Sequence, residues 1–238
     1  MIRRDYILRM IEEFIRALAK ITALKQGQRW GETSEALDEE FKRLIGSDAQ
    51  TVAQLSETEL LARLLQGEPT QVVRQKTLLL TTLLKEAGDV AAATDHPEAS
   101  RDCYLKALHL LLETLASGEV FEWPEFVPKV QLLVDALQPT ALPAHTQAML
   151  MLHYERTGEF AKAENALFAL LDAEPANNAI VKFGIAFYQR LLGQSDIALS
   201  EANLPREEVE EGLKELQERR TKVEQRLRPA QQNGKVAE

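Results

Sequence analysis

The segment from residue 144 to residue 177, AHTQAMLMLHYERTGEFAKAENALFALLDAEPAN, is the stretch that most constrains the fold of this chain. Apolar residues at helical spacing precede Gly158, and a second apolar set follows it as far as Pro175. Glycine adopts the left-handed backbone of a tight turn at no steric cost, and proline cannot continue a helix. The segment therefore predicts two helices joined as a hairpin at Gly158.

This hairpin resembles a tetratricopeptide repeat in its 34-residue form. Tyr154 stands where the motif has an aromatic residue, and Ala163 stands where a small side chain lets the two helices approach closely. The resemblance implies a stack of helical hairpins that binds its ligands in a shared groove. The sequence departs from the motif at Gln147, Met151, Leu167 and Leu170.

A second and fainter copy of the repeat starts within an apolar pattern that predicts a helix from about Thr70 to Ala93. Residues 94–97, Thr-Asp-His-Pro, are expected to form its turn. The second helix of this copy is expected to continue to about Ala116, past the place where the motif ends with proline. The motif positions of the first helix of the copy are Leu84, Ala87, Gly88 and Ala91, and the small, aromatic and small positions of its second helix are Ser100, Tyr104 and Ala107.

Residues 2 to 26 predict an amphipathic helix, because apolar side chains recur at spacings of three and four. Three uses of its wide apolar face are open: packing in the core, a seam between two copies of the chain, and attachment to a membrane surface. Mixed charges on the polar side disfavour attachment to a membrane. The apolar face consists of Ile7, Met10, Ile11, Phe14, Ala17, Leu18, Ile21 and Leu24.

The same N-terminal stretch, MIRRDYILRMIEEFIRALAKI, resembles the opening of a bacterial family known only as a domain of unknown function. The likeness rests on the run from Arg4 to Ile7 and the run from Arg9 to Glu12, and it is expected to cover the N-terminal third. It implies no activity.

Capping and turn signals divide the remainder of the chain. Ser56 and Glu59 have the spacing of a capping box, and Gly46 is expected to end a helix. One helix is expected between Gly118 and Pro143, and the last helix is expected to cap the array or to pair with another helix. The predicted organisation is a helical hairpin region at 1–66, tetratricopeptide-like repeats at 69–204, a charged C-terminal helix at 205–228 and a disordered tail at 229–238. The expected fold class is all-α, with antiparallel hairpins stacked as a short α-solenoid.

Composition excludes several classes of partner. The formal net charge of −9 argues against a nucleic-acid partner, which needs a clustered basic face. Charged residues interrupt the apolar run at the N-terminus, so neither a signal peptide nor a membrane span is expected. A single cysteine, Cys103, cannot form an internal disulfide, which fits a reducing cytoplasm.

The sequence has no motif for catalysis, for a cofactor or for a metal. It lacks a glycine-rich phosphate loop, a His-Glu-x-x-His pair and a Gly-x-Ser-x-Gly elbow. Its four histidines do not fall at the spacing of three or four that would place two on one helix face. We therefore expect a protein that is not an enzyme.

The repeat resemblance implies where a partner would lie, because ligands of such arrays usually occupy the concave surface formed by the first helices. Small and apolar residues there suggest a groove that receives a helix, from this chain, from a second copy or from another protein. The favoured function is a protein-protein interaction or scaffold protein, with a homodimer left open. The alternative is a regulatory sensor that binds a peptide or small molecule in the groove. The candidate groove residues are Lys85, Asp89, Ala92, Ala93, Ala148, Leu152, Glu155 and Arg156.

Overall fold

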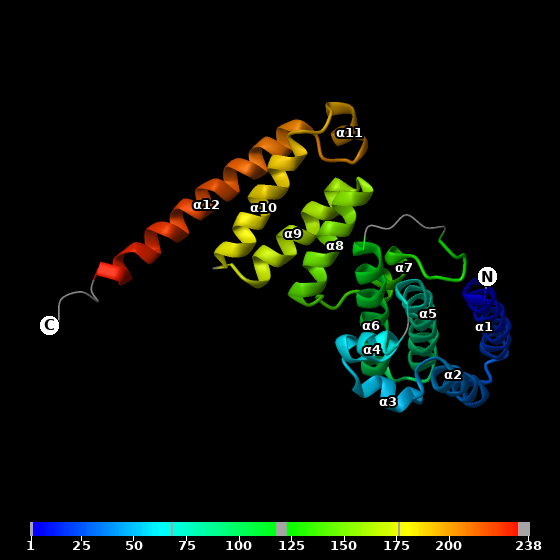
Figure 1. The fold of residues 1–238 in the computed structure, drawn as a ribbon. Helices are drawn as coiled ribbons and strands as arrows, with labels where there is room; N and C mark the ends of the chain where they lie inside the picture. The colour runs from blue at the N-terminus through cyan, green and yellow to red at the C-terminus, as the bar shows by residue number, and fades with distance from the viewer. Residues whose placement is uncertain (1, 68, 118–122, 176, 233–238) are drawn as a thin grey trace. The chain divides into compact units, whose positions relative to one another are not determined.

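The computed structural model describes residues 2–67, 69–117, 123–175 and 177–232, and the side chains of 2–4 and 223–232 are not part of that description. Within these residues the chain is helical and contains no strand, so the all-α prediction is confirmed (Figure 1). The helices are α1 (Ile2–Gln26), α2 (Trp30–Ile45), α3 (Ala49–Gln54), α4 (Glu57–Leu65), α5 (Thr70–Ala93), α6 (Pro97–Ala116), α7 (Val130–Ala136), α8 (Ala144–Thr157), α9 (Phe160–Ala173), α10 (Asn178–Leu191), α11 (Asp196–Glu201) and α12 (Arg206–Gln232).

The chain divides into two compact units, Met1–Ala141 and Leu142–Glu238. The division falls inside the 69–204 range that the sequence assigned to one array of repeats. Helix α12 continues through residues 229–232, the first part of the expected tail. The remainder of that tail, residues 233–238, lies outside the described residues.

Helix α5 is the central element of the first unit. Leu78, Leu79 and Leu80 are consecutive and all buried, as are Leu83 and Leu84. Consecutive residues of a helix point in different directions, so their common burial requires neighbours on several sides. Those neighbours are α1, α2, α4 and α6.

Helices α5 and α6 form the hairpin predicted for the fainter repeat copy. The turn lies at residues 94–96, one residue shorter than predicted, because Pro97 is already the first residue of α6, where its missing N–H has no cost. A Cβ placed on Gly88 would lie 2.9 Å from Cε1 of Tyr104, so the two helices touch through the predicted small and aromatic positions. The predicted ends of these helices at Ala93 and Ala116 are confirmed.

The predicted caps are also present. Gly46 has a φ of 72° and ends α2 in the left-handed region, which glycine tolerates. At the start of α4 the Ser56 hydroxyl accepts from the Glu59 amide, and the Glu59 carboxylate accepts from the Ser56 amide at 2.8 Å. These bonds satisfy backbone donors that would otherwise have no partner in the helix.

The second unit begins with the hairpin of α8 and α9. Gly158 has a φ of 77° and forms the turn that the sequence predicted. Tyr154 on α8 and Ala163 on α9 are both buried, in keeping with their expected places between the helices. The hairpin is therefore confirmed as a local structure.

Helix α12 packs against α10 through close approaches at two glycines. A Cβ on Gly212 of α12 would overlap the ring of Tyr188 on α10, and a Cβ on Gly184 of α10 would overlap Leu216 of α12. Val209 is buried together with Leu216, so the first half of α12 covers α10 of its own chain. The expected stripe positions Val223 and Leu227 lie outside the described side chains.

Candidate functional site

Two of the predicted groove residues, Lys85 and Asp89, belong to an ion-pair network between α1, α5 and α6. The Lys85 ammonium donates to Glu86 Oε1 at 3.0 Å and to Asp89 Oδ2 at 2.9 Å. Lys25, at the end of α1, donates to both carboxylates. The Tyr104 hydroxyl donates to Asp89 Oδ1 at 2.7 Å. The end of α1 therefore contacts two of the positions proposed for a partner.

The hydrogen bonds of the network favour the charged forms of Asp89 and Lys85. Burial raises the pKa of Asp89, but the hydrogen bonds from Lys25, Tyr104 and Lys85 outweigh burial and leave this pKa below its ordinary value. Burial alone would lower the pKa of Lys85, but Glu86 and Asp89 raise it overall. At neutral pH Lys85 and Asp89 are therefore charged and bonded within the chain.

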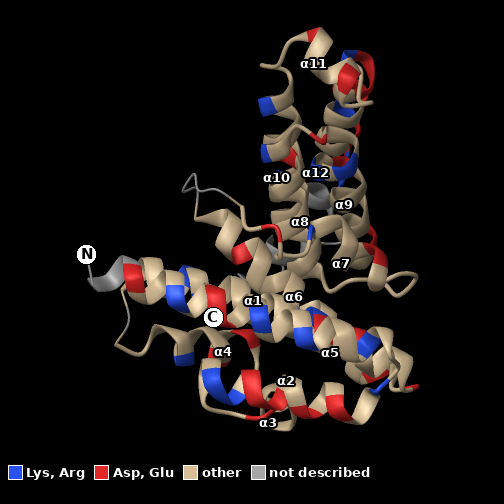
Figure 2. Cartoon of the chain, turned by 90° about the vertical axis from the view of Figure 1, so that its right-hand side faces the viewer, with Lys and Arg blue, Asp and Glu red and all other residues tan. Residues whose placement is uncertain are grey.

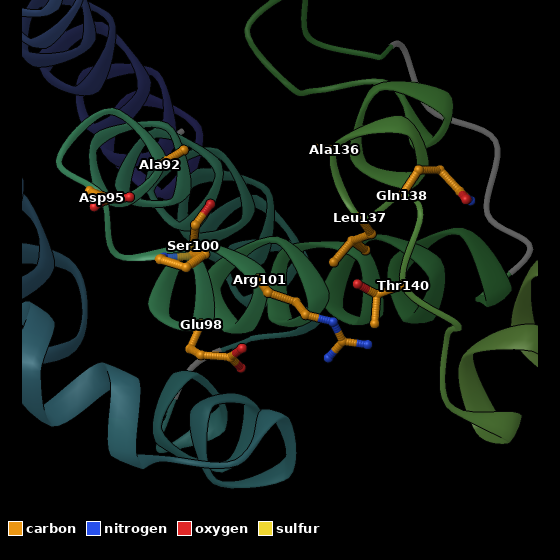
Figure 3. Close-up of a pocket in the computed structure, with 10 residues that line it drawn as sticks. Ala92, Asp95, Glu98, Ser100, Arg101, Ala136, Leu137, Gln138 and Thr140 are labelled. Atoms are coloured by element: carbon orange, nitrogen blue, oxygen red, sulfur yellow. The ribbon is translucent and has the colours of Figure 1, made fainter.

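The other two groove positions of α5, Ala92 and Ala93, are exposed, and Ala92 lines a pocket of about 300 Å3. The pocket lies between the end of α5, the start of α6 and the segment that follows α7 (Figure 3). Its apolar lining is formed by Ala92, Pro97, Ala136 and Leu137. Its polar lining is formed by Asp95, Glu98, Ser100, Arg101, Gln138 and Thr140.

Arg101 is the one basic residue of this lining. Its Nη2 donates to the Ala141 carbonyl at 3.0 Å, whereas its Nε is buried and has no hydrogen-bond partner among the described residues. Neither Asp95 nor Glu98 has a side-chain hydrogen bond or ion pair with the described part of the chain. Figure 3 shows Arg101 extending toward Thr140, with Asp95 and Glu98 away from that end. The pocket thus has a cationic donor and separate carboxylate acceptors.

The predicted groove positions of α8 lie in the second unit, so they are described apart from those of α5. Leu152 is 41% exposed and Ala148 is partly buried. Glu155 accepts two hydrogen bonds from Arg190 of α10, at 2.6 and 2.8 Å, and this bond raises the pKa of Arg190. Arg156 is exposed. The structure brings Leu152 and Ala148 to the surface and engages Glu155 in a pair between helices.

Sequence reasoning did not single out a row of exposed and half-exposed apolar residues on α1. Leu8 and Ile15 are each 49% exposed, and Ile11 and Leu18 between and after them are partly exposed. These four residues follow spacings of three, four and three, so they form one stripe, here named the outer stripe. The core face of the same helix is formed by Met10, Phe14, Ile21 and Leu24, which are buried.

The spacing of the outer stripe was visible in the sequence. Ile11 and Leu18 were assigned to a single wide face, but Leu8 and Ile15 were left out of it. A count of both residues at the same helical spacing would have shown two apolar faces rather than one.

The cysteine and two of the histidines, side chains that often act in catalysis, are partly buried or hydrogen-bonded within the chain. Burial raises the pKa of the Cys103 thiol to about 11, so this thiol is protonated and weakly nucleophilic at neutral pH. His109 is hydrogen-bonded to Glu57 at 2.8 Å, and burial lowers the pKa of His153. In the described ranges, no group of three or more His, Cys, Asp or Glu side chains could hold a metal ion.

Comparison with known proteins places the chain in a family. Residues 1–221 match the family of unknown function DUF6483, and the chain belongs to this family. The match extends well beyond the N-terminal third for which a resemblance was expected. No curated protein and no solved structure matches the chain. Among the described residues, no helix has both the length and the apolar character needed to span a membrane.

Proposed function

We propose that this protein is a non-enzymatic interaction or scaffold protein, and that the outer stripe of α1 is the surface on which its partner docks. The partner is a protein with an amphipathic helix, which lays its apolar face along Leu8, Ile11, Ile15 and Leu18. We place this function in the reducing cytoplasm, which is consistent with a chain that has a single cysteine.

The observation that carries this proposal is the half exposure of Leu8 and Ile15 in one row. Full burial of a leucine or isoleucine is worth roughly 1.5–3 kcal/mol, so covering the exposed half of each would contribute about 1 kcal/mol. Isolated apolar residues on a surface are ordinary, but a continuous row on one helix is typical of a surface that another helix covers.

The charges beside the outer stripe define the partner further. Figure 2 shows both signs of charge along α1. Glu12 and Arg16 are exposed near the stripe, and the Arg16 side chain hydrogen-bonds only the Glu12 carbonyl in the described structure. A partner helix with both signs of charge beside its apolar face would complement this pattern, which favours specificity over raw affinity.

We further propose that each of these hairpins is a tetratricopeptide-like unit. In α5–α6 this is supported by the close approach of Gly88 to Tyr104. In α8–α9 it is supported by the burial of Tyr154 and Ala163. Each pair combines a small residue with an aromatic one at the positions expected from the repeat.

Quantitative affinity purification of the full chain from its own cells tests the docking surface. A variant with both Leu8→Glu and Ile15→Glu should recover at least tenfold less of the specific partner than the parent chain does. The reason is that two charges buried in the interface would have no counterpart. The matched control is Ala23→Glu, which adds a charge at an exposed position of the same helix that is not part of the outer stripe. Equal recovery of every partner by the double variant and the control would refute the proposal, provided circular dichroism shows both to be folded.

A further inference from the structure

We infer that the pocket between α5, α6 and the segment after α7 is a binding site for a small zwitterion, a molecule that carries a carboxylate and an ammonium group. The inference goes beyond the proposed docking surface and does not depend on it. The pocket lies within the first unit and does not include the outer stripe of α1. It corresponds to the sensor that the sequence left open as an alternative.

The first argument is the state of Arg101. Arg101 lines the pocket, and the one hydrogen bond that its guanidinium makes with the described residues runs from Nη2 to the Ala141 carbonyl. Its Nε is buried and out of reach of a ligand, but Nη1 and the second N–H of Nη2 are not bonded to the described residues. A carboxylate accepts well from a guanidinium, because two parallel N–H groups match its two oxygens. A ligand carboxylate at this end of the guanidinium would therefore accept from both Nη atoms.

The second argument is the pair of acidic side chains in the same lining. Asp95 and Glu98 have no cationic partner among the residues described, although Glu98 lies three positions before Arg101 on α6. An ammonium group supplies three donors and a positive charge, which these carboxylates would accept. The separation of donor and acceptor groups in the pocket therefore fits a molecule with both charges.

The third argument is size. A volume of about 300 Å3 is at the lower end of ligand pockets, which favours a small molecule over a folded partner. Ala92 and Pro97 are exposed and line the pocket, so they supply apolar surface for an aliphatic side chain. These features together point to an aliphatic amino acid or a very short peptide.

Isothermal titration of the full chain with a matched set of ligands tests the inference. L-leucine carries both charges, leucinamide lacks the carboxylate, and N-acetyl-leucine lacks the ammonium group. We expect saturable binding of L-leucine or of L-leucyl-L-leucine, and at least tenfold weaker binding of the two analogues. The stronger of the first two ligands identifies the source as a free amino acid or as a peptide.

Variants of the full chain assign the two ends of the pocket. Arg101→Ala should weaken binding at least tenfold, and Arg101→Lys should restore little of it, because lysine has no planar pair of donors. Glu98→Gln should weaken the zwitterion several-fold while it leaves N-acetyl-leucine unchanged. Lys129→Ala removes an exposed positive charge outside the pocket and should change binding less than twofold.

Two results would overturn the inference. One is the absence of saturable binding of both zwitterions at millimolar concentration. The other is equal affinity for L-leucine and its two analogues, since it would show that neither charge is recognised. Circular dichroism of the Arg101 variants separates a loss of binding from a loss of fold, and Glu98→Gln provides an independent readout.

Discussion

At the scale of single residues, the contact between Gly212 and Tyr188 holds α12 to α10. Tyr188 is fully buried, and its hydroxyl donates to Glu164 at 2.6 Å. Burial and this bond raise the pKa of Tyr188, so the hydroxyl is a neutral donor at physiological pH. The ring leaves no room for a side chain at position 212.

Gly212→Ala is therefore expected to destabilise the protein by about 1–3 kcal/mol, because the added methyl must displace the buried ring or shift α12. The matched control is Gly31→Ala in α2, where a Cβ would have no neighbour within 4 Å. That change should be neutral or stabilise by at most about 0.5 kcal/mol, since alanine is the better helix former but position 31 lies in the first turn of α2. Urea unfolding measures both, and a neutral Gly212→Ala would contradict the packing of α12 on α10.

The ion-pair network predicts a dependence on pH. The pKa of Asp89 is lower in the folded protein than its ordinary value of 3.8, so its contribution to stability is complete above about pH 4 and is lost as the pH falls through the folded pKa. Asp89→Asn should cost about 1–3 kcal/mol at pH 7, because Lys25 and Lys85 lose one of two carboxylates. The difference between the variant and the parent chain should shrink toward pH 3. A difference that is the same at pH 7 and pH 3 would show that the charge of Asp89 has no role.

At the scale of elements, α12 covers α10 along its first half. Val209, Gly212 and Leu216 all lie before Lys222, the last residue of the helix with a described side chain. Chains truncated before and after these contacts therefore test whether α12 caps the second unit.

A chain that ends at Leu204 lacks α12, so Tyr188 and Gly184, the residues of α10 that α12 contacts, should become exposed. The second unit should then lose its cooperative unfolding. A chain that ends at Lys222 keeps the buried contacts and should unfold like the full chain. Differential scanning calorimetry compares the three lengths. Unchanged unfolding of the version that ends at Leu204 would show that α12 does not cap the unit.

Elements were the part of the fold that the sequence predicted best. The bounds of α5 and the ends of α2 and α6 follow from local signals, namely apolar spacing, a C-terminal glycine and a proline in the first turn. The contact of Gly88 with Tyr104 was accessible because both residues occupy repeat positions within one hairpin. The contact of Gly212 with Tyr188 could not be predicted, because no sequence signal near either residue specifies which helix that residue packs against.

At the scale of the whole molecule, the chain divides into two units between Ala141 and Leu142, and this division separates the residues of the predicted groove into two sets. Its residues on α5 and its residues on α8 belong to different units, and Lys85 and Asp89 are bonded to their own chain. The pocket beside Ala92 was beyond sequence reasoning, since its lining joins residues about 40 positions apart through the packing of α7 near α6. The proposed docking surface, the outer stripe of α1, lies within the first unit alone.

The most direct test of the proposed docking surface is photo-crosslinking in the protein's own cells. A benzoylphenylalanine placed at Leu8 should form a discrete adduct with one partner protein, and Ile15→Glu in the same chain should abolish this adduct. An adduct of twice the chain's mass would identify the partner as a second copy. The same probe at the exposed position Lys20 should give at most a faint adduct. The absence of any adduct from position 8, or equal adducts from positions 8 and 20, would contradict the assignment of α1 as the docking helix.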